Sequence, residues 1–200
     1  MTRSPADVRL DALLRTTCDV IRERGLANTR TADVAQAAGV SQALIFYHFT
    51  KKERLLAQAF AYAAEQDLAR LDLVMRSAAD PLVKLKKILR LYAPPGRSKS
   101  WALWIDGWSE SQRTPELERV SRRLDLRWRE ALTEVIIAGC TDGTFTCTDP
   151  TGAAWRINAL IDGLAVQVSV HNRVISRRQV ADWIRLAAAR ELGLEPAELS

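Results

Sequence analysis

Residues 28–56 read NTRTADVAQAAGVSQALIFYHFTKKERLL and carry the clearest structural signal in this chain of 200 residues. Small apolar residues at helical spacing precede Gly39, and glycine readily ends a helix in a left-handed turn. Ser41 can cap a second helix, whose apolar face would be formed by Ile45 and Phe49, four residues apart. Two short helices joined by such a turn are typical of a helix-turn-helix.

Polar residues mark the ends of the helices around this turn. We expect Thr31 to be the N-cap of the first helix, and Thr50 and Glu53 to form a capping box that opens a third helix. Lys51 and Lys52 would then lie in the first turn of that helix, where the helix dipole disfavours cations. The pattern favours a helix end that faces an anion such as a DNA phosphate; two solvated lysines beside a cap are the alternative.

The charge balance permits binding to nucleic acid. The chain has 29 Lys and Arg against 24 Asp and Glu, and residues 1–55 hold nine of the basic and six of the acidic residues. More than half of the net charge of +5 therefore lies in roughly a quarter of the chain. This excess is compatible with DNA binding but does not establish it.

Other functional classes find little support in the sequence. It has no phosphate-binding glycine loop, dinucleotide fingerprint or nucleophile elbow, so we expect neither an enzyme nor a cofactor. The three cysteines, Cys18, Cys140 and Cys147, lack the spacing of metal ligands. No apolar run approaches the ~18 residues of a membrane span, and the first residues lack a signal-peptide pattern. We expect a soluble cytoplasmic protein with reduced thiols and no membrane partner.

Helix signals continue along the chain and predict an all-α protein of about nine helices. A helix over Asp7–Gly25 would complete a three-helix unit with the helix-turn-helix, and a long helix over Lys51–Ser77 would lead into a second domain. We therefore predict a DNA-binding domain over residues 1–55 and a helical ligand-binding and dimerisation domain over residues 56–200. Within the second domain, Gly139 is expected to end a helix.

The last two predicted helices indicate a second subunit. The helix over Asp149–Asn172 is apolar on nearly all sides, so one side would meet the core and another a partner copy. The final helix begins at a capping box of Ser176 and Gln179. A buried core helix in a monomer is the alternative. The residues expected at the interface between two copies are Ile157, Leu160, Ile161, Leu164, Val168, Val180, Trp183 and Ile184.

Three of the six tryptophans, Trp101, Trp104 and Trp108, fall on one face of one predicted helix. An aromatic face near acidic residues could hold a cationic or aromatic small molecule, but this spacing is also typical of a core or an interface. Asn158 and Asp162 lie one turn apart on an otherwise apolar helix, and buried polar groups need partners. A ligand is one such partner, and a neighbouring helix is another. These five residues form the candidate ligand site.

Residues 28–56 resemble the DNA-binding segment of the TetR family of bacterial transcriptional regulators. The resemblance is strong over about the first third of the chain and rests on helix pattern and length in the remainder. The matching elements are Thr31, VAQAAGVS over Val34–Ser41, the aromatic block over Ile45–Phe49, and K-x-x-LL over Lys52–Leu56. The stretches Trp101–Trp108 and Leu160–Leu164 are similar to the BetI-like branch of that family.

The resemblance implies roles for the matching positions. By this likeness, the phosphate contacts would be Thr31, Tyr47, His48 and Lys52, the base contacts would be Gln42, Ala43 and Leu44, and Ser41 and Lys51 would belong to the same surface. The chemistry agrees for Gln42, whose amide can pair with adenine. Phe46 stands where the family often has a tyrosine, so we assign it to packing.

The resemblance also implies a function for the whole chain. It implies a repressor that forms a homodimer through a four-helix interface and binds a palindromic double-stranded operator. A small-molecule effector of unknown identity would release this repressor from the operator. Such an effector would act by favouring one spacing of the two recognition helices, with the Lys51–Ser77 helix as the lever. A constitutive DNA-binding protein with no inducer is the alternative.

Overall fold

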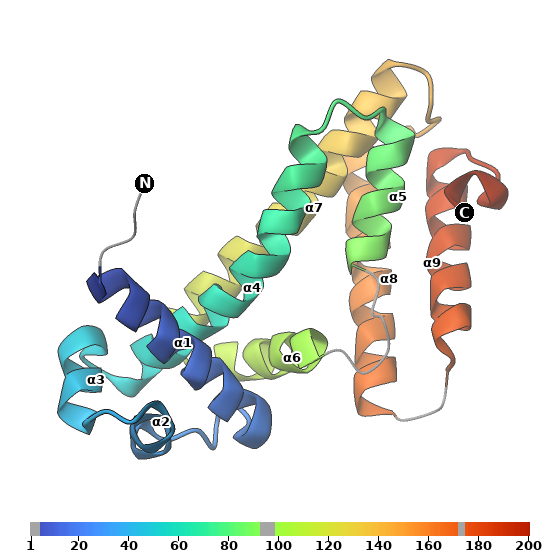
Figure 1. The fold of residues 1–200 in the computed structure, drawn as a ribbon. Helices are drawn as coiled ribbons and strands as arrows, with labels where there is room; N and C mark the ends of the chain where they lie inside the picture. Colours follow the sequence, from blue (N-terminus) through green and yellow to red (C-terminus); the bar gives the residue numbers. More distant parts are fainter. Residues whose placement is uncertain (1–4, 93–98, 172–174) are drawn as a thin grey trace. The chain divides into compact units, whose positions relative to one another are not determined.

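The structure, a computed structural model, describes residues 5–92, 99–171 and 175–200. These residues form nine α-helices and a short 3-10 helix, with no strand among them (Figure 1), which confirms the predicted all-α class. The elements are α1 (Pro5–Arg24), α2 (Thr31–Ala38), α3 (Gln42–Phe49), α4 (Lys52–Arg76), α5 (Pro81–Tyr92), α6 (Lys99–Ser111), α7 (Pro115–Thr141), α8 (Pro150–Val170), α9 (Arg177–Leu192) and η1 (Pro196–Leu199). None of the helices in the described ranges could span a membrane.

The chain divides into two compact units, each built from two stretches of sequence. Unit 1 comprises Met1–Gln66 and Ala102–Leu124, and unit 2 comprises Asp67–Trp101 and Asp125–Ser200. The boundaries fall inside α4, α6 and α7, so each of these helices continues from one unit into the other. The sequence predicts a different boundary, between residues 55 and 56, which separates a DNA-binding domain from a ligand-binding domain. That functional division stays a prediction.

Unit 1 joins the first three helices to most of α6 and to the first parts of α4 and α7. Phe49 and Leu26 are fully buried in its core. A Cβ at Gly107 would lie 2.6 Å from the Phe60 ring, so the glycine lets α6 approach α4 closely. Asp106 accepts a hydrogen bond of 2.5 Å from the backbone N–H of Leu26, which satisfies a donor just beyond the end of α1. The α6 segment is therefore fixed to the N-terminal helices.

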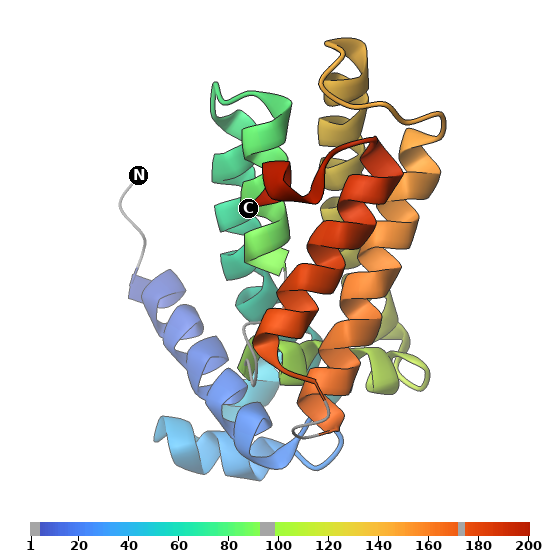
Figure 2. The same cartoon turned by 90° about the vertical axis from the view of Figure 1, so that its right-hand side faces the viewer.

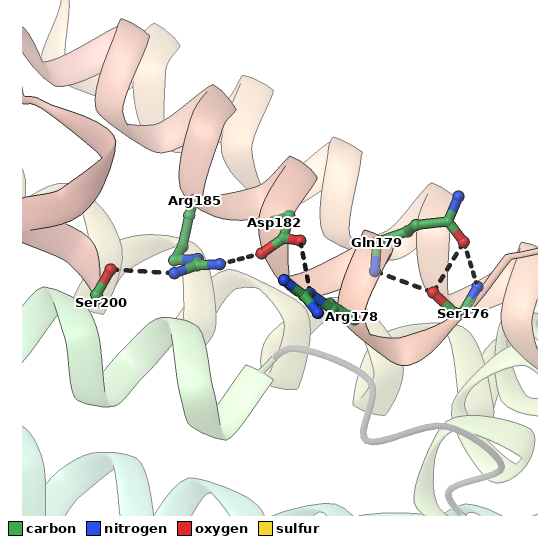
Figure 3. A network of polar contacts seen from close by, with 6 residues as sticks. All are labelled: Ser176, Arg178, Gln179, Asp182, Arg185 and Ser200. Carbon is green, nitrogen blue, oxygen red and sulfur yellow. Dashed lines mark hydrogen bonds and ion pairs between the residues drawn. The ribbon is translucent and has the colours of Figure 1, made fainter.

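In unit 2, α8 and α9 lie side by side (Figures 1 and 2). Both helices begin where the sequence predicts: Asp149 accepts the N–H of Gly152 at 2.9 Å, and Ser176 forms a reciprocal capping box with Gln179 (Figure 3). The first helix ends at Val170, and the predicted end at Asn172 lies outside the described residues.

Ion pairs continue along α9 from its capping box (Figure 3). Asp182 lies between two arginines: it contacts Arg178 at 3.8 Å and accepts a hydrogen bond from Arg185. Arg185 also donates to the Ser200 hydroxyl at 3.1 Å. These contacts link Ser200, the residue after η1, to the middle of α9.

Two predicted N-caps are wrong. The N-cap of α2 is Arg30 rather than Thr31, and the Asp33 carboxylate accepts the Arg30 N–H at 3.2 Å. The carboxylate therefore supplies the cap from inside the helix, and the Thr31 hydroxyl makes another contact. The second wrong N-cap is that of α4, which starts at Lys52; Thr50 instead ends α3 with a φ of 65°. The turn is one residue too short for the expected capping box.

The predicted end of α7 is also wrong. The helix continues past Gly139 to Thr141, and the left-handed glycine that follows it is Gly143, with a φ of 83°. Gly139 has a packing role: a Cβ there would lie 2.2 Å from the ring of Phe145, which is 3% exposed. The missing side chain makes room for an aromatic ring from the following loop.

Candidate DNA-binding surface and effector site

The turn between α2 and α3 sets the direction in which α3 is presented. Gly39 has a φ of 65° and a ψ of 32°, and the Val40 N–H bonds to the Ala35 carbonyl at 3.0 Å, as in a left-handed helix end. The Ser41 side chain caps α3 by accepting the N–H of Leu44 at 3.2 Å. Both predicted turn residues therefore have the expected local role.

The helix α3 has a narrow buried face and a wide exposed one. Ile45 and Phe49 are 0% and 1% exposed and hold it to the core, as predicted. Tyr47 is 81% exposed and Leu44 40%, although both side chains are largely apolar. Exposed large apolar groups clustered on one short helix indicate an interaction surface. The exposed residues of α3 are Gln42, Ala43, Leu44, Phe46, Tyr47 and His48.

The first residues of α2 and α3 contact each other. The Thr31 hydroxyl donates to the Gln42 side-chain oxygen at 3.4 Å. This contact places the Gln42 amide at the N-terminal end of α3, the part of a recognition helix that reaches base edges. The side chains of Thr31 and Gln42 are therefore adjacent, and their contacts with DNA remain predictions.

The two lysines at the start of α4 already have partners in unit 1. Lys51 forms an ion pair with Glu116 in the first turn of α7, and its hydrogen bond lowers the pKa of that carboxyl. Lys52 donates to the Ala27 carbonyl oxygen at 3.4 Å. Such solvent-exposed contacts contribute little free energy, so a DNA phosphate could replace them at small cost.

Unit 2 contains a second candidate site, where a tyrosine packed between two tryptophans donates a hydrogen bond to a carboxylate. The Tyr92 ring stacks on Trp128 with centroids 4.7 Å apart and lies 5.4 Å from the ring of Trp101. Its hydroxyl donates to one Asp162 oxygen at 2.5 Å, while the Asn158 amide donates to the other at 2.7 Å. We call Tyr92, Trp101, Trp128, Asn158 and Asp162 the aromatic–carboxylate cluster.

Burial dominates the electrostatics of this cluster. Removal from water raises the pKa of Asp162 to about 6; the Tyr92 hydrogen bond and Arg129 lower it, and the charge of Asp125 raises it. Burial likewise raises the pKa of Asp125, which contacts Arg129 at 2.8 Å. Burial and the neighbouring Asp162 raise the pKa of Tyr92 well above its ordinary value. An anion held here at a free-energy cost would be stabilised by a bound cation.

The candidate ligand residues are only partly brought together. Trp101, Asn158 and Asp162 belong to the cluster in unit 2, whereas Trp104 and Trp108 lie in unit 1. Trp104 packs edge-on against Phe60 at 5.1 Å, as a core residue does. The sequence reading missed two cluster members, Tyr92 and Trp128. Both stand at positions typical of core packing, so Tyr92 is identified only by its hydrogen bond to Asp162, and Trp128 only by its stacking on Tyr92.

The residues expected at a dimer interface occupy two environments. Five of them are at most 7% exposed inside unit 2, so they serve the core of the unit: Ile157, Ile161, Leu164, Val180 and Ile184. Leu160 and Val168 are half-buried, and Trp183 is 40% exposed. Three further large apolar side chains are exposed on these helices, Trp155 at 51%, Val170 at 57% and Leu186 at 38%.

An exposed α3 held by a glycine turn, beside lysines at the start of the next helix, defines a helix-turn-helix DNA-binding protein. The sequence pattern of bacterial regulatory proteins of the tetR family matches residues 13–59, and that of the BetI-type transcriptional repressor C-terminal region matches residues 81–193. The chain belongs to the TetR family, with a C-terminal region of the BetI type. It is a DNA-binding transcriptional repressor and not an enzyme.

Individual relatives agree with this assignment. The chain is 28% identical over 84% of its length to the HTH-type transcriptional regulator BetI of Rhizobium meliloti (strain 1021), covering 82% of that protein. It is 30% identical to BetI of Paraburkholderia xenovorans (strain LB400), covering 79% of this chain and 80% of the relative. A transcriptional regulator from Saccharomonospora viridis, solved in complex with choline, superposes with a TM-score of 0.83 and 28% identity, covering 94% of this chain and 98% of that one.

Proposed function

We propose that this repressor binds a two-fold symmetric operator as a homodimer and is released from it by a small organic cation, of which a quaternary ammonium compound is the best-fitting class. The aromatic–carboxylate cluster carries the proposal. The faces of aromatic rings attract cations, and quaternary ammonium groups are recognised by such faces because they cannot donate hydrogen bonds. Asp162 would supply the opposite charge.

The choline bound to the Saccharomonospora viridis protein supports the same chemistry, because that protein is similar over nearly the whole chain. Residues of the cluster itself make the argument specific. Tyr92 and Asn158 now satisfy both oxygens of Asp162, and Tyr92 stacks on Trp128. A cation that approaches Asp162 would compete with the Tyr92 hydroxyl for the carboxylate. Binding and a rearrangement of the cluster would therefore be coupled.

Chain connectivity offers a route from this cluster to the DNA-binding helices. Trp101 is the last residue of α6 in unit 2, and the same helix continues into unit 1 as far as Asp106 and Gly107. Asp106 accepts the N–H of Leu26 just after α1, and Gly107 packs on Phe60 of α4. A change at Trp101 would thus act on a helix fixed to the DNA-binding part. The effector shifts DNA affinity only by its differential affinity for the two arrangements.

The DNA contacts remain as the sequence predicts them. Gln42, at the start of α3, would pair with a base edge, with Ala43 and Leu44 against thymine methyl groups. Tyr47, His48, Thr31, Ser41 and the two lysines would contact phosphates around it. The high exposure of Tyr47 supports its role, because an exposed aromatic side chain contributes little to folding.

The second copy would dock on α8 and α9. Trp183, Leu186 and Val170 expose large apolar surfaces there, and the small residues Ala159 and Gly163 on α8 are also exposed and would permit close approach. A recognition helix from each copy would then read half-sites about 34–36 Å apart, which is why a palindromic operator is expected.

Selection of bound duplexes from a random DNA pool tests the first half of the proposal. The expected result is an inverted repeat bound at least ~10³-fold more tightly than scrambled DNA at physiological salt. The fluorescence anisotropy of the labelled operator is then measured with choline and with 3,3-dimethylbutan-1-ol, its uncharged isostere. Release by choline but not by the alcohol supports a cation effector. No release by any quaternary ammonium compound would favour a constitutive DNA-binding protein.

Variants locate the effector site in the same assay. Asp162→Asn removes the charge of the cluster and should abolish the choline response while leaving operator affinity intact. Asp67→Asn makes the same change on α4 in unit 2, at a carboxylate paired with Arg70 at 3.7 Å, and should leave the response unchanged. An unaltered response in Asp162→Asn would remove the cluster from the effector site.

A further inference from the structure

Two of the three cysteines are neighbours in the fold although the sequence gives no reason to pair them. Cys140 lies in the last turn of α7, and Cys147 in the loop that leads to α8. The Cys140 thiol donates to the backbone carbonyl oxygen of Cys147 at 3.8 Å. Burial raises the pKa of Cys140, and the adjacent Cys147 raises it further. Both residues are half-buried, so small reagents can reach them.

The loop between these cysteines is held in place on both sides. The Phe145 ring occupies the space left by Gly139, and the Phe145 N–H bonds to the Gly139 carbonyl at 2.8 Å. The next residue, Thr146, donates its N–H to the Leu192 carbonyl at the end of α9, also at 2.8 Å. Cys147 is therefore presented to Cys140 by a fixed backbone rather than by chance encounter of a free loop.

We propose that Cys140 and Cys147 form a reversible disulfide, which makes the α7–α8 corner a site of oxidation by low-molecular-weight disulfides such as oxidised glutathione. One thiolate attacks the glutathione disulfide, its S–S bond breaks, and the first glutathione thiolate leaves. The second cysteine attacks the mixed disulfide, the protein S–S bond forms, and the second glutathione leaves. In total, two cysteine thiols and one oxidised glutathione become one protein disulfide and two reduced glutathiones.

Cys18 provides an internal reference for this chemistry. It is 2% exposed in unit 1, donates to the Ala59 carbonyl at 3.1 Å, and burial raises its pKa to about 11. Because the thiolate is the reactive species, Cys18 should stay reduced while the protein is folded. The three thiols thus separate into one inert buried group and one adjacent pair.

The equilibrium with glutathione measures whether the fold brings the pair together. The full-length protein is equilibrated in buffers with a series of ratios of reduced to oxidised glutathione, both native and in urea. Reactions are quenched with acid, free thiols are alkylated under denaturing conditions, and intact mass and peptide mapping identify the oxidised pair. The expected equilibrium constant for the Cys140–Cys147 disulfide is at least tenfold larger in the native protein, because the fold has already closed the loop.

Three other outcomes would each overturn the proposal. Equal or smaller constants in the native protein would mean that the fold does not favour the bond. Mapping of a disulfide to Cys18, or only mixed glutathione adducts, would also overturn it. Cys140→Ser and Cys147→Ser serve as matched controls: each should retain two thiols, form glutathione adducts only at the remaining cysteine of the pair, and show no intramolecular bond.

Discussion

The exposed face of α3 and the aromatic–carboxylate cluster depart from ordinary folding rules in opposite ways. α3 leaves aromatic and aliphatic side chains in water, with Tyr47 81% exposed. The cluster buries polar ones: Asn158 is 3% exposed, and burial raises the pKa of Asp162. A folded chain gains free energy by burying apolar groups and loses it by burying charge, so neither arrangement is explained by stability.

The difference shows what each region can lose without unfolding. Side chains on the exposed face of α3 have few neighbours within the chain, so their removal should affect binding to DNA and little else. Side chains of the cluster contact one another, so their removal should change stability and effector response together. Substitutions matched between the two regions can test this contrast.

The largest expected effect comes from removing an aromatic ring in each region. Trp128 is 4% exposed, and Trp128→Ala should lower the free energy of unfolding by about 3–5 kcal/mol, because it leaves a cavity under Tyr92. Tyr47→Ala should change it by no more than about 0.5 kcal/mol. Urea denaturation followed by circular dichroism measures both. Similar losses in the two variants would contradict the contrast.

The charge in the cluster predicts a pH-dependent stability difference. The folded-state pKa of Asp162, about 6, lies above its ordinary value of 3.8, so the folded protein binds more protons between these values. The wild type should therefore lose stability relative to Asp162→Asn as pH rises from about 4 to 6. Between pH 3 and pH 7 the stability difference should shift in favour of the variant by up to about 3 kcal/mol. Denaturation curves of both proteins at several pH values give the difference in their free energies of unfolding. A difference that does not change with pH would contradict the burial of the charge.

The DNA-binding face predicts changes in affinity of intermediate size. Gln42→Ala should cost about 1–3 kcal/mol on the selected operator and little on scrambled DNA, because it removes a base contact. Lys52→Ala should weaken binding to every sequence and reduce the salt slope by about one, because it removes a phosphate contact. Anisotropy titrations at several salt concentrations separate the two. Equal losses on all sequences for both variants would overturn the assigned roles.

These two regions also differ in how far the sequence alone could identify them. The recognition turn depends on local chemistry: Gly39 supplies a left-handed conformation and Ser41 a cap, and both can be inferred from adjacent residues. The cluster depends on α5, α6, α7 and α8 meeting in space. Asp162 could be suspected as a polar residue on an apolar helix, whereas Tyr92 and Trp128 could not be distinguished from ordinary core residues.

The errors at helix ends have the same origin. The capping box expected from Thr50 failed because that residue had to end α3 with a φ of 65°, a requirement set by the short turn to α4. Gly139 was expected to end a helix, but it instead makes room for Phe145 from a later loop. The first error comes from the length of a turn and the second from a ring placed by a later loop, and neither is visible in the pattern of adjacent residues.

The smallest expected effect is the one that tests the cluster most directly. Tyr92→Phe keeps the ring that stacks on Trp128 but removes the hydroxyl that donates to Asp162 at 2.5 Å. If the effector cation competes with this hydroxyl for the carboxylate, the variant should bind choline about threefold to tenfold more tightly, the equivalent of one hydrogen bond. Tyr62→Phe makes the same change on α4 in unit 1 and should leave choline affinity unchanged. Isothermal titration with choline measures both, and weaker binding by Tyr92→Phe would mean that the hydroxyl contacts the ligand rather than competing with it.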